Sequence, residues 1–117
     1  MLIGRVSELT GATRKAIRHY ESIGLIVAPE RKGNYRIYNE HDVVVIKMIC
    51  RAKALGFSLS EIKDIVSRKT KEKELPIELV TLLIDEKMLA LKQEAMDLLL
   101  KAENLNQFKL DLVKEFT

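Results

Sequence analysis

Seven apolar residues near the carboxyl end of the chain follow one another at alternating steps of four and three. They are Ile84, Met88, Leu91, Ala95, Leu98, Ala102 and Leu105. This spacing is a heptad seam, which is typical of a long helix that packs along another helix. In a chain of 117 residues, so long a helix has little else to pack on. The seam therefore predicts a homodimer, and packing within one chain is the alternative.

The first 24 residues predict two short helices around a tight turn. Apolar residues recur at helical spacing in each, and each is followed by a glycine, which is common just past a helix end. Thr13 is a good N-cap for the second helix, which carries Arg14, Lys15 and Arg18 away from its apolar side. Such a pair of helices is what a helix-turn-helix needs to place its second helix in the major groove of DNA.

The segment after these helices predicts a small β-hairpin, or wing. Residues 25–27 and 35–38 have the apolar and aromatic composition of short strands, and the turn-rich residues 29–34 separate them. Beyond the wing, Asn39 and Ser58 are each placed to cap a further helix. The apolar side of the first of these helices predicts buried residues, which are Val43, Ile46, Ile49, Cys50 and Leu55.

The expected fold is therefore mainly α. A winged helix-turn-helix head with two further helices, residues 1–71, is followed by a dimerisation helix and a short C-terminal effector region, residues 72–117. We interpret the charged residues 68–74 as a linker or a frayed helix end, and Pro76 suits the first turn of the last helix. Because the sequence ends at Thr117, we expect no large C-terminal pocket for a drug-like ligand.

Charge is distributed unevenly along the chain. Residues 1–71 hold fourteen Lys and Arg against seven Asp and Glu, which is a net charge of +7. Residues 72–117 hold six against ten, which is a net charge of −4. This asymmetry favours a head that binds a polyanion and a tail kept away from it. Chance asymmetry on solvated helix faces is the alternative.

Other classes of protein find little support in the sequence. It contains no Gly-rich phosphate loop, no HExxH motif and no nucleophile elbow, so we expect no enzyme and no cofactor. No apolar run approaches the ~20 residues of a membrane span, and the first residues lack the apolar core of a signal peptide. A single cysteine fits a reducing compartment, and we expect a cytoplasmic protein with no membrane partner.

A series of motifs in the first 67 residues carries a family resemblance. They are Ile3-Gly4, Thr10-Gly11, Arg18-His19-Tyr20-Glu21, Gly24-Leu25, Tyr35-Arg36-Ile37-Tyr38, Asp42, Leu55-Gly56-Phe57-Ser58-Leu59 and Glu61-Ile62. In this order and at these spacings, the chain resembles MerR-family transcription regulators. The resemblance implies an antiparallel coiled coil between two copies, binding of pseudo-palindromic promoter DNA as a homodimer, and distortion of that DNA in response to an effector. RNA polymerase is then an expected partner.

The chemistry of the residues suggests roles that agree with this resemblance. Arg18 and Arg36 are suited to phosphate oxygens, while Arg14 and Lys15, early on the second helix, are placed to reach base edges. For Arg18 and Arg36 the alternative is a surface ion pair, and Glu21 lies three residues from Arg18.

Three aromatic or imidazole side chains complete the predicted DNA-binding set. Tyr20 and Tyr38 offer hydroxyls to the DNA backbone or rings to pack the wing, and for Tyr20 simple core packing is the alternative. His19 stands where the family usually has Tyr, and a neutral imidazole can donate to phosphate in its place.

The sequence gives little information about the effector. Metal-sensing members of the family carry cysteines around the dimerisation helix. This chain has only one cysteine, Cys50, so we do not expect it to bind a metal through thiolates. Cys50 lies close to where some members hold a redox-sensing or aldehyde-sensing cysteine, and an inert core residue is the alternative. Two other functions stay open: an architectural or recombination-directionality protein that bends DNA, and a coiled-coil interaction module with incidental basic charge.

Overall fold

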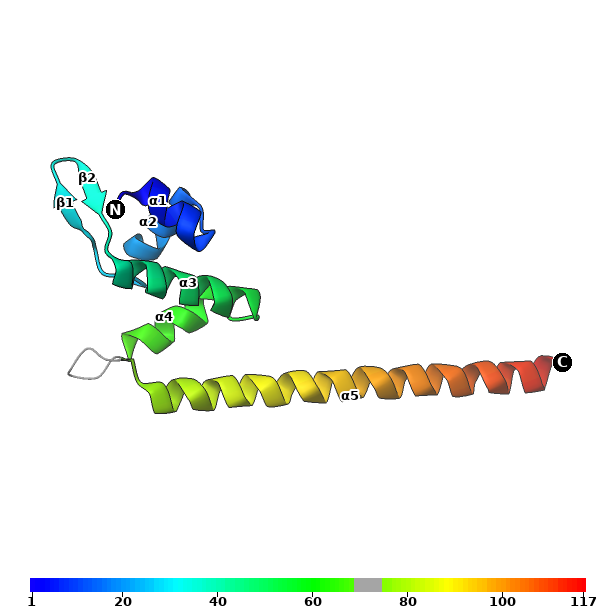
Figure 1. The fold of residues 1–117 in the computed structure, drawn as a ribbon. Coiled ribbons are helices and arrows are strands. Elements are labelled where there is room, and N and C mark those ends of the chain that lie inside the picture. Colours follow the sequence, from blue (N-terminus) through cyan, green and yellow to red (C-terminus); the bar gives the residue numbers. More distant parts are fainter. Residues whose placement is uncertain (69–74) are drawn as a thin grey trace. The chain divides into compact units, whose positions relative to one another are not determined.

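The computed structural model describes residues 1–68 and 75–117. It divides the chain into two compact units, Met1–Pro76 and Ile77–Thr117, each of which is considered by itself below. Except for Arg68, the predicted linker lies outside the described residues, and so does the predicted domain boundary after residue 71. The first unit holds four helices and a two-stranded sheet among its described residues, and the second is one helix (Figure 1).

The helix-turn-helix is formed by α1, Ile3–Thr10, and α2, Arg14–Ser22. Gly11 takes a left-handed conformation with φ of 77°, and its N–H bonds to the Ser7 carbonyl, which closes α1. The Thr13 hydroxyl accepts a hydrogen bond of 3.0 Å from the Ala16 N–H, which confirms Thr13 as the N-cap of α2.

The wing is an antiparallel hairpin of β1, Glu30–Lys32, and β2, Tyr35–Ile37. The predicted second strand is confirmed, but the prediction of the first at residues 25–27 is wrong. The hairpin turns at the two residues between Lys32 and Tyr35, where Gly33 has φ of 63°, so the register puts β1 immediately before this turn. Leu25 and Ile26 have strand-like composition because they fill the core.

Two more helices support the head: α3, Glu40–Ala54, and α4, Leu59–Ser67. Both predicted caps are confirmed. The Asp42 N–H donates to Asn39 Oδ1 at 2.8 Å and the Asn39 N–H to Asp42 Oδ2 at 2.9 Å, and Ser58 forms the same reciprocal box with Glu61.

One predicted core residue of α3 lies elsewhere. Leu55 is 67% exposed, because it is the C-cap of α3 and the chain turns away from the helix axis at Gly56, whose φ is 103°. Helical spacing therefore no longer applies to Leu55. Of the other predicted residues of this side, Val43, Ile46 and Ile49 are buried and Cys50 is half-buried.

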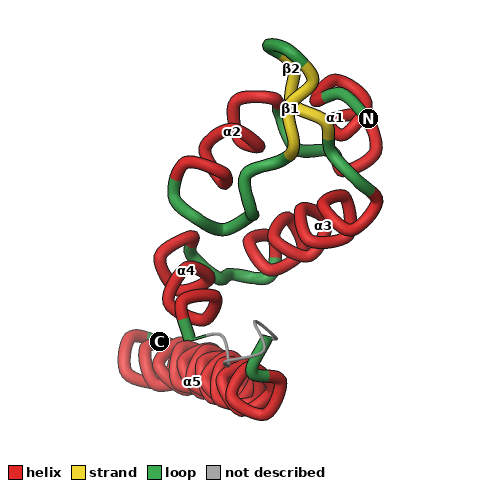
Figure 2. The backbone as a smooth tube through the Cα atoms, turned by 90° about the vertical axis from the view of Figure 1, so that its left-hand side faces the viewer, coloured by secondary structure: helices red, strands yellow, loops and turns green. Residues whose placement is uncertain are grey.

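The core of the head lies where α1, α2 and α3 meet the base of the hairpin (Figure 2). Its buried side chains are Val6, Ala12, Ile17, Tyr20, Leu25, Ile26, Tyr38, Val43, Ile46, Ile49 and Ile62. The hairpin is tied to this core just after β2, because the Tyr38 N–H bonds to the Met1 carbonyl at 2.7 Å. Both α2 and the wing are thus held at fixed places on one small body.

The second unit is α5, Ile77–Phe116, which begins directly after Pro76 and confirms the long helix. Its 40 residues correspond to a rod of about 60 Å at the α-helical rise per residue. All of α5 lies in the described part of the chain, and none of its residues is buried. No helix in the described part of the chain combines the length and hydropathy that a membrane crossing needs.

Candidate nucleic-acid interface

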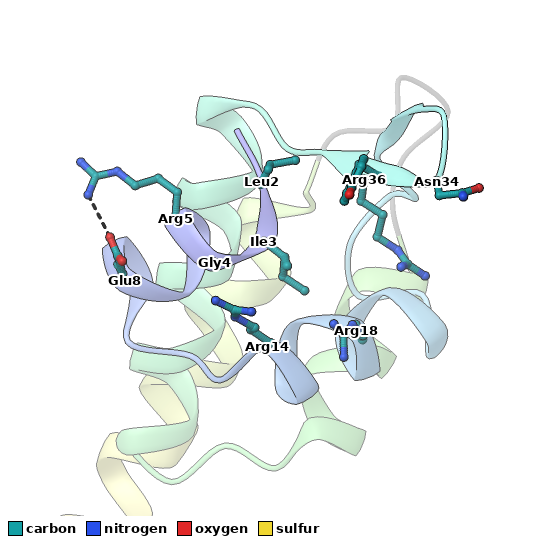
Figure 3. A pocket seen from close by; sticks show the side chains of 10 residues that line it. Leu2, Ile3, Gly4, Arg5, Glu8, Arg14, Arg18, Asn34 and Arg36 are labelled. Carbon is teal, nitrogen blue, oxygen red and sulfur yellow. Dashed lines mark hydrogen bonds and ion pairs between the residues drawn. The ribbon is translucent and has the colours of Figure 1, made fainter.

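Arginines from three elements of the head surround one concave surface, which we call the basic cleft (Figure 3). Its volume is about 630 Å³. It is lined by Leu2, Ile3, Gly4, Arg5, Glu8, Arg14, Arg18, Asn34, Tyr35 and Arg36. The cleft thus joins the start of α1, the outer side of α2 and the turn and second strand of the wing. Such a surface suits the phosphates of a nucleic acid backbone.

Arg14 lies directly against the backbone of α1. Its terminal Nη2 atom is 2.8 Å from the position that a Cβ on Gly4 would take. The missing side chain at Gly4 is therefore what lets the Arg14 guanidinium occupy this part of the cleft. Arg5, in contrast, turns to the rim, where its Nη1 pairs with Glu8 Oε2 at 3.2 Å.

Glu21 pairs with the wing rather than with its neighbour on α2. Arg36 Nε donates to Glu21 Oε2 at 2.8 Å, and the two side chains are 30% and 15% exposed. The alternative considered for Arg18 and Arg36 was an ion pair. Arg36 forms one, with Glu21, whereas no ion pair of Arg18 is found among the described residues. Arg18 is an exposed cation of the cleft, whereas Arg36 is an anchored one.

The two predicted tyrosines lie in the core. Tyr20 is 3% exposed, and the Lys53 ammonium lies 5.8 Å from the centre of its ring. Tyr38 is 1% exposed, and its buried hydroxyl has no hydrogen-bond partner among the described residues. Burial raises the pKa of the Tyr38 hydroxyl above its usual value of 10.0, and the charge of Glu21 adds to the rise. Core packing of Tyr20, the alternative considered above, is what the structure shows, and the Tyr38 hydroxyl is shielded from DNA.

The remaining predicted contacts lie on α2. Lys15 and His19 are exposed, as are Arg14 and Arg18. Of these four residues, Arg14 and Arg18 line the basic cleft.

Sequence reasoning missed the residues that α1 and the hairpin turn contribute to the cleft. Arg5 comes from α1, and Asn34 and Tyr35 come from the wing. Tyr35 is 66% exposed and lies at the start of β2, next to the hairpin turn. The available signal was the position of Tyr35 beside a two-residue turn, because a tip residue of a short hairpin has little core to enter.

The predicted dimer residues form an exposed apolar line along α5. The larger ones are Ile84 at 40%, Met88 at 48%, Leu91 at 54%, Leu98 at 61% and Leu105 at 63% exposure. Ala95 and Ala102 are exposed as well. In the described part of the chain no residue of α5 is buried, as expected for a surface that a second helix completes.

Cys50 is a free, half-buried thiol that packs against the core of the head. This position agrees with the core alternative and leaves the sensor hypothesis untested. In residues 1–68 and 75–117, no group of three or more His, Cys, Asp or Glu side chains is placed to hold a metal ion.

The fold and the basic cleft together define a winged helix-turn-helix protein. Comparison with known proteins identifies the family to which it belongs. Residues 1–69 match the family described as MerR HTH family regulatory protein, and residues 43–107 match the family described as MerR, DNA binding. The chain belongs to the MerR family.

Individual relatives agree with this placement. The HTH-type transcriptional regulator YfmP of Bacillus subtilis (strain 168) is 38% identical over 117 residues, covering 98% of this chain and 79% of that protein. Heavy metal-dependent transcription regulator 2 of Rhizobium meliloti (strain 1021) is 41% identical over 68 residues, covering 57% and 46%. The chain spans about half the length of several such curated relatives.

A solved structure extends the likeness to both units. The transcription regulator PbrR691 from Ralstonia metallidurans CH34, crystallised in complex with lead(II), superimposes with a TM-score of 0.67 at 27% identity. The match covers 90% of this chain and 82% of that one.

Proposed function

We propose that this protein is a DNA-binding transcription regulator that grips a pseudo-palindromic promoter site as a homodimer. The observation that carries the proposal is the basic cleft, in which Arg14, Arg18 and Arg36 come together from the recognition helix and the wing. α2 enters the major groove, with Arg14 and Lys15 at base edges, and the wing lies on the flanking backbone. The seam of α5 pairs the two copies as an antiparallel coiled coil, so that two heads meet one duplex.

The proposal extends to the response of the promoter. An effector shifts the dimer between two arrangements that distort the DNA differently. The distortion determines how RNA polymerase uses the promoter. The relatives are named transcriptional regulators, which supports regulation over a purely architectural or recombination role and over catalysis. A protein with this task acts in the cytoplasm, where promoter DNA is transcribed. Several relatives have names or titles that mention a metal, but the effector of this chain stays unassigned.

The dependence of DNA binding on salt tests the proposal. The chain is expected to bind a mixed-sequence duplex with an affinity that falls steeply as salt rises. Two or three phosphates neutralised by each head of a dimer give a slope of log affinity against log salt of about −4 to −5 on B-DNA. Fluorescence anisotropy of a labelled duplex at a series of salt concentrations measures this slope. A weak and nearly flat response would instead identify a coiled-coil module with incidental charge.

Gly4→Ala is expected to weaken DNA binding while leaving the head folded. A methyl group at this position would meet Arg14 Nη2 at 2.8 Å, and the flexible side chain would leave its place in the cleft. Replacing a helical glycine by alanine raises stability by at most about 1 kcal/mol. Affinity should therefore fall while the melting temperature holds or rises, as anisotropy and circular dichroism would show.

Arg14→Ala is the matched comparison for this prediction. If Gly4→Ala acts through Arg14, the two changes together should weaken binding no more than Arg14→Ala does. Unaltered affinity of Gly4→Ala would show that the resting place of Arg14 has no part in binding.

A further inference from the structure

The carboxylate of Glu21 does not itself line the basic cleft, but it bonds to Arg36, which does. It comes from the last turn of α2 and bonds to Arg36 on β2, fifteen residues further along the chain. A negative charge on such a surface repels phosphate, so charge alone gives no reason for a carboxylate here. Its contact with Arg36 suggests a different role.

The bond uses one particular part of the Arg36 guanidinium. Arginine has five N–H donors, and Nε carries one of them. Because Nε bonds to Glu21, the two terminal nitrogens keep their four donors for another partner. Figure 3 shows the Arg36 side chain extending from β2 toward α2, on the side of the cleft where Arg18 lies. These terminal nitrogens are the ones that make forked bonds to phosphate.

Other cations crowd the same place. Arg31 lies directly opposite Arg36 across the hairpin, and Arg18 lines the same cleft. Like charges in directly opposed strand positions repel one another. Without Glu21, repulsion would favour conformations in which Arg36 turns away to solvent. The Glu21 side chain is only 15% exposed, so it has little free space in which to turn away from Arg36.

We infer that Glu21 is a positioning residue for DNA binding. By holding Nε of Arg36, it fixes the wing to the recognition helix and directs the terminal nitrogens of Arg36 toward the phosphate that Arg18 also contacts. This inference rests on the proposed DNA-binding function. The buried Tyr38 hydroxyl lies close enough to Glu21 and Arg36 to respond to both charges, which agrees with a pair seated at the base of the wing.

The change in DNA affinity when the Glu21 carboxylate is removed distinguishes a positioning role from simple repulsion of phosphate. Removal of a carboxylate that only repels phosphate strengthens binding. Removal of a carboxylate that positions Arg36 weakens it. Glu21→Ala is expected to bind a mixed-sequence duplex about a hundredfold more weakly, because each of the two heads loses an oriented charged hydrogen bond. The salt slope should also become shallower, by about 0.9 for each phosphate that is no longer neutralised.

Three further variants complete the experiment. Arg36→Ala should give a loss similar to that of Glu21→Ala, and the double variant should lose no more than either change. Glu21→Gln keeps an acceptor for Nε without the charge and should bind with intermediate affinity. Glu30→Ala is the matched control, because it removes an exposed carboxylate of the wing that forms no ion pair among the described residues. It should bind as well as the parent or slightly better.

All affinities are measured on the full chain by fluorescence anisotropy, with circular dichroism melting to confirm that each variant is folded. Where Glu21→Ala does not fold, Glu21→Gln and Arg36→Ala decide the question. The inference is overturned if the folded variant lacking the Glu21 charge binds as tightly as the parent with the same salt slope, or if the losses in the double variant add. A parent protein that shows no salt-dependent duplex binding would instead overturn the proposed function itself.

Discussion

Leu91→Asp is expected to convert the dimer into folded monomers and to abolish tight binding to DNA. Leu91 lies in the middle of the seam, with Met88 and Ala95 on either side, and it is 54% exposed in the single chain. In a coiled coil this position is covered by the facing helix. A carboxylate there would enter an apolar interface without a partner, which is strongly unfavourable.

The magnitudes indicate that one substitution is enough. Burial of each large apolar side chain of the seam contributes about 1.5 to 3 kcal/mol, against an association cost of about 4 to 15 kcal/mol. The change acts twice in a symmetric dimer, because both copies lose Leu91 and gain an unpaired charge. A loss of about 5 kcal/mol or more weakens dimerisation by over a thousandfold.

Light scattering coupled to gel filtration measures the outcome directly. Ala90→Asp is a matched control, because it adds the same carboxylate one residue away and off the seam. It should stay dimeric, while Leu91→Asp should elute as a monomer with the head still folded by circular dichroism. Persistence of a dimer in Leu91→Asp would place the interface on another surface.

The structure shows why some elements of the head were predictable from sequence. Thr13, Asn39 and Ser58 each cap a helix through a side chain that accepts from the backbone N–H three residues ahead. Such contacts are local, so residue type and spacing suffice to predict them. The heptad seam is predictable for the same reason, because its repeat lies within one helix.

Two predictions from the sequence are wrong, because tertiary contacts decide where a strand forms and where a helix ends. Leu25 and Ile26 have the composition of a strand, yet their side chains fill the core beneath the recognition helix. Leu55 continues the apolar spacing of α3 by one step beyond the place where the helix ends. Periodicity describes which side chains share a face, but the last residue to which it applies depends on where the backbone turns.

The candidate site was predictable in its residue types but not in its pairing. Sequence distance suggested Arg18 as the partner of Glu21, since residues three apart on a helix are neighbours. The structure instead brings Arg36 to Glu21 from the wing. The contact of Arg14 with Gly4 is equally invisible in sequence, because it depends on how α1 and α2 cross. Only the fold shows that these basic residues, which are separate in the sequence, meet at one cleft.

Arg18→Ala is expected to weaken binding by a similar factor on every duplex tested. Arg18 is exposed, and no ion pair of it is found in the described part of the chain, so its removal should cost the fold little. If it neutralises a phosphate, each head loses a charged hydrogen bond that contributes about 1.5 kcal/mol, and a dimer then binds about a hundredfold more weakly. The salt slope should become shallower by about 0.9 per head.

Comparison with Arg14→Ala distinguishes contacts to the backbone from contacts to bases. Arg14 stands at the first position of α2, where side chains of a recognition helix reach base edges, so its loss should relax preference at one position of each half-site. Binding to a library of randomised duplexes, read by sequencing, separates the two patterns. Lys63→Ala on α4 is the matched control, because it removes an exposed cation that does not line the basic cleft. Equal affinity of Arg18→Ala and the parent would remove Arg18 from the interface, and a change in its sequence preference would make it a base contact instead.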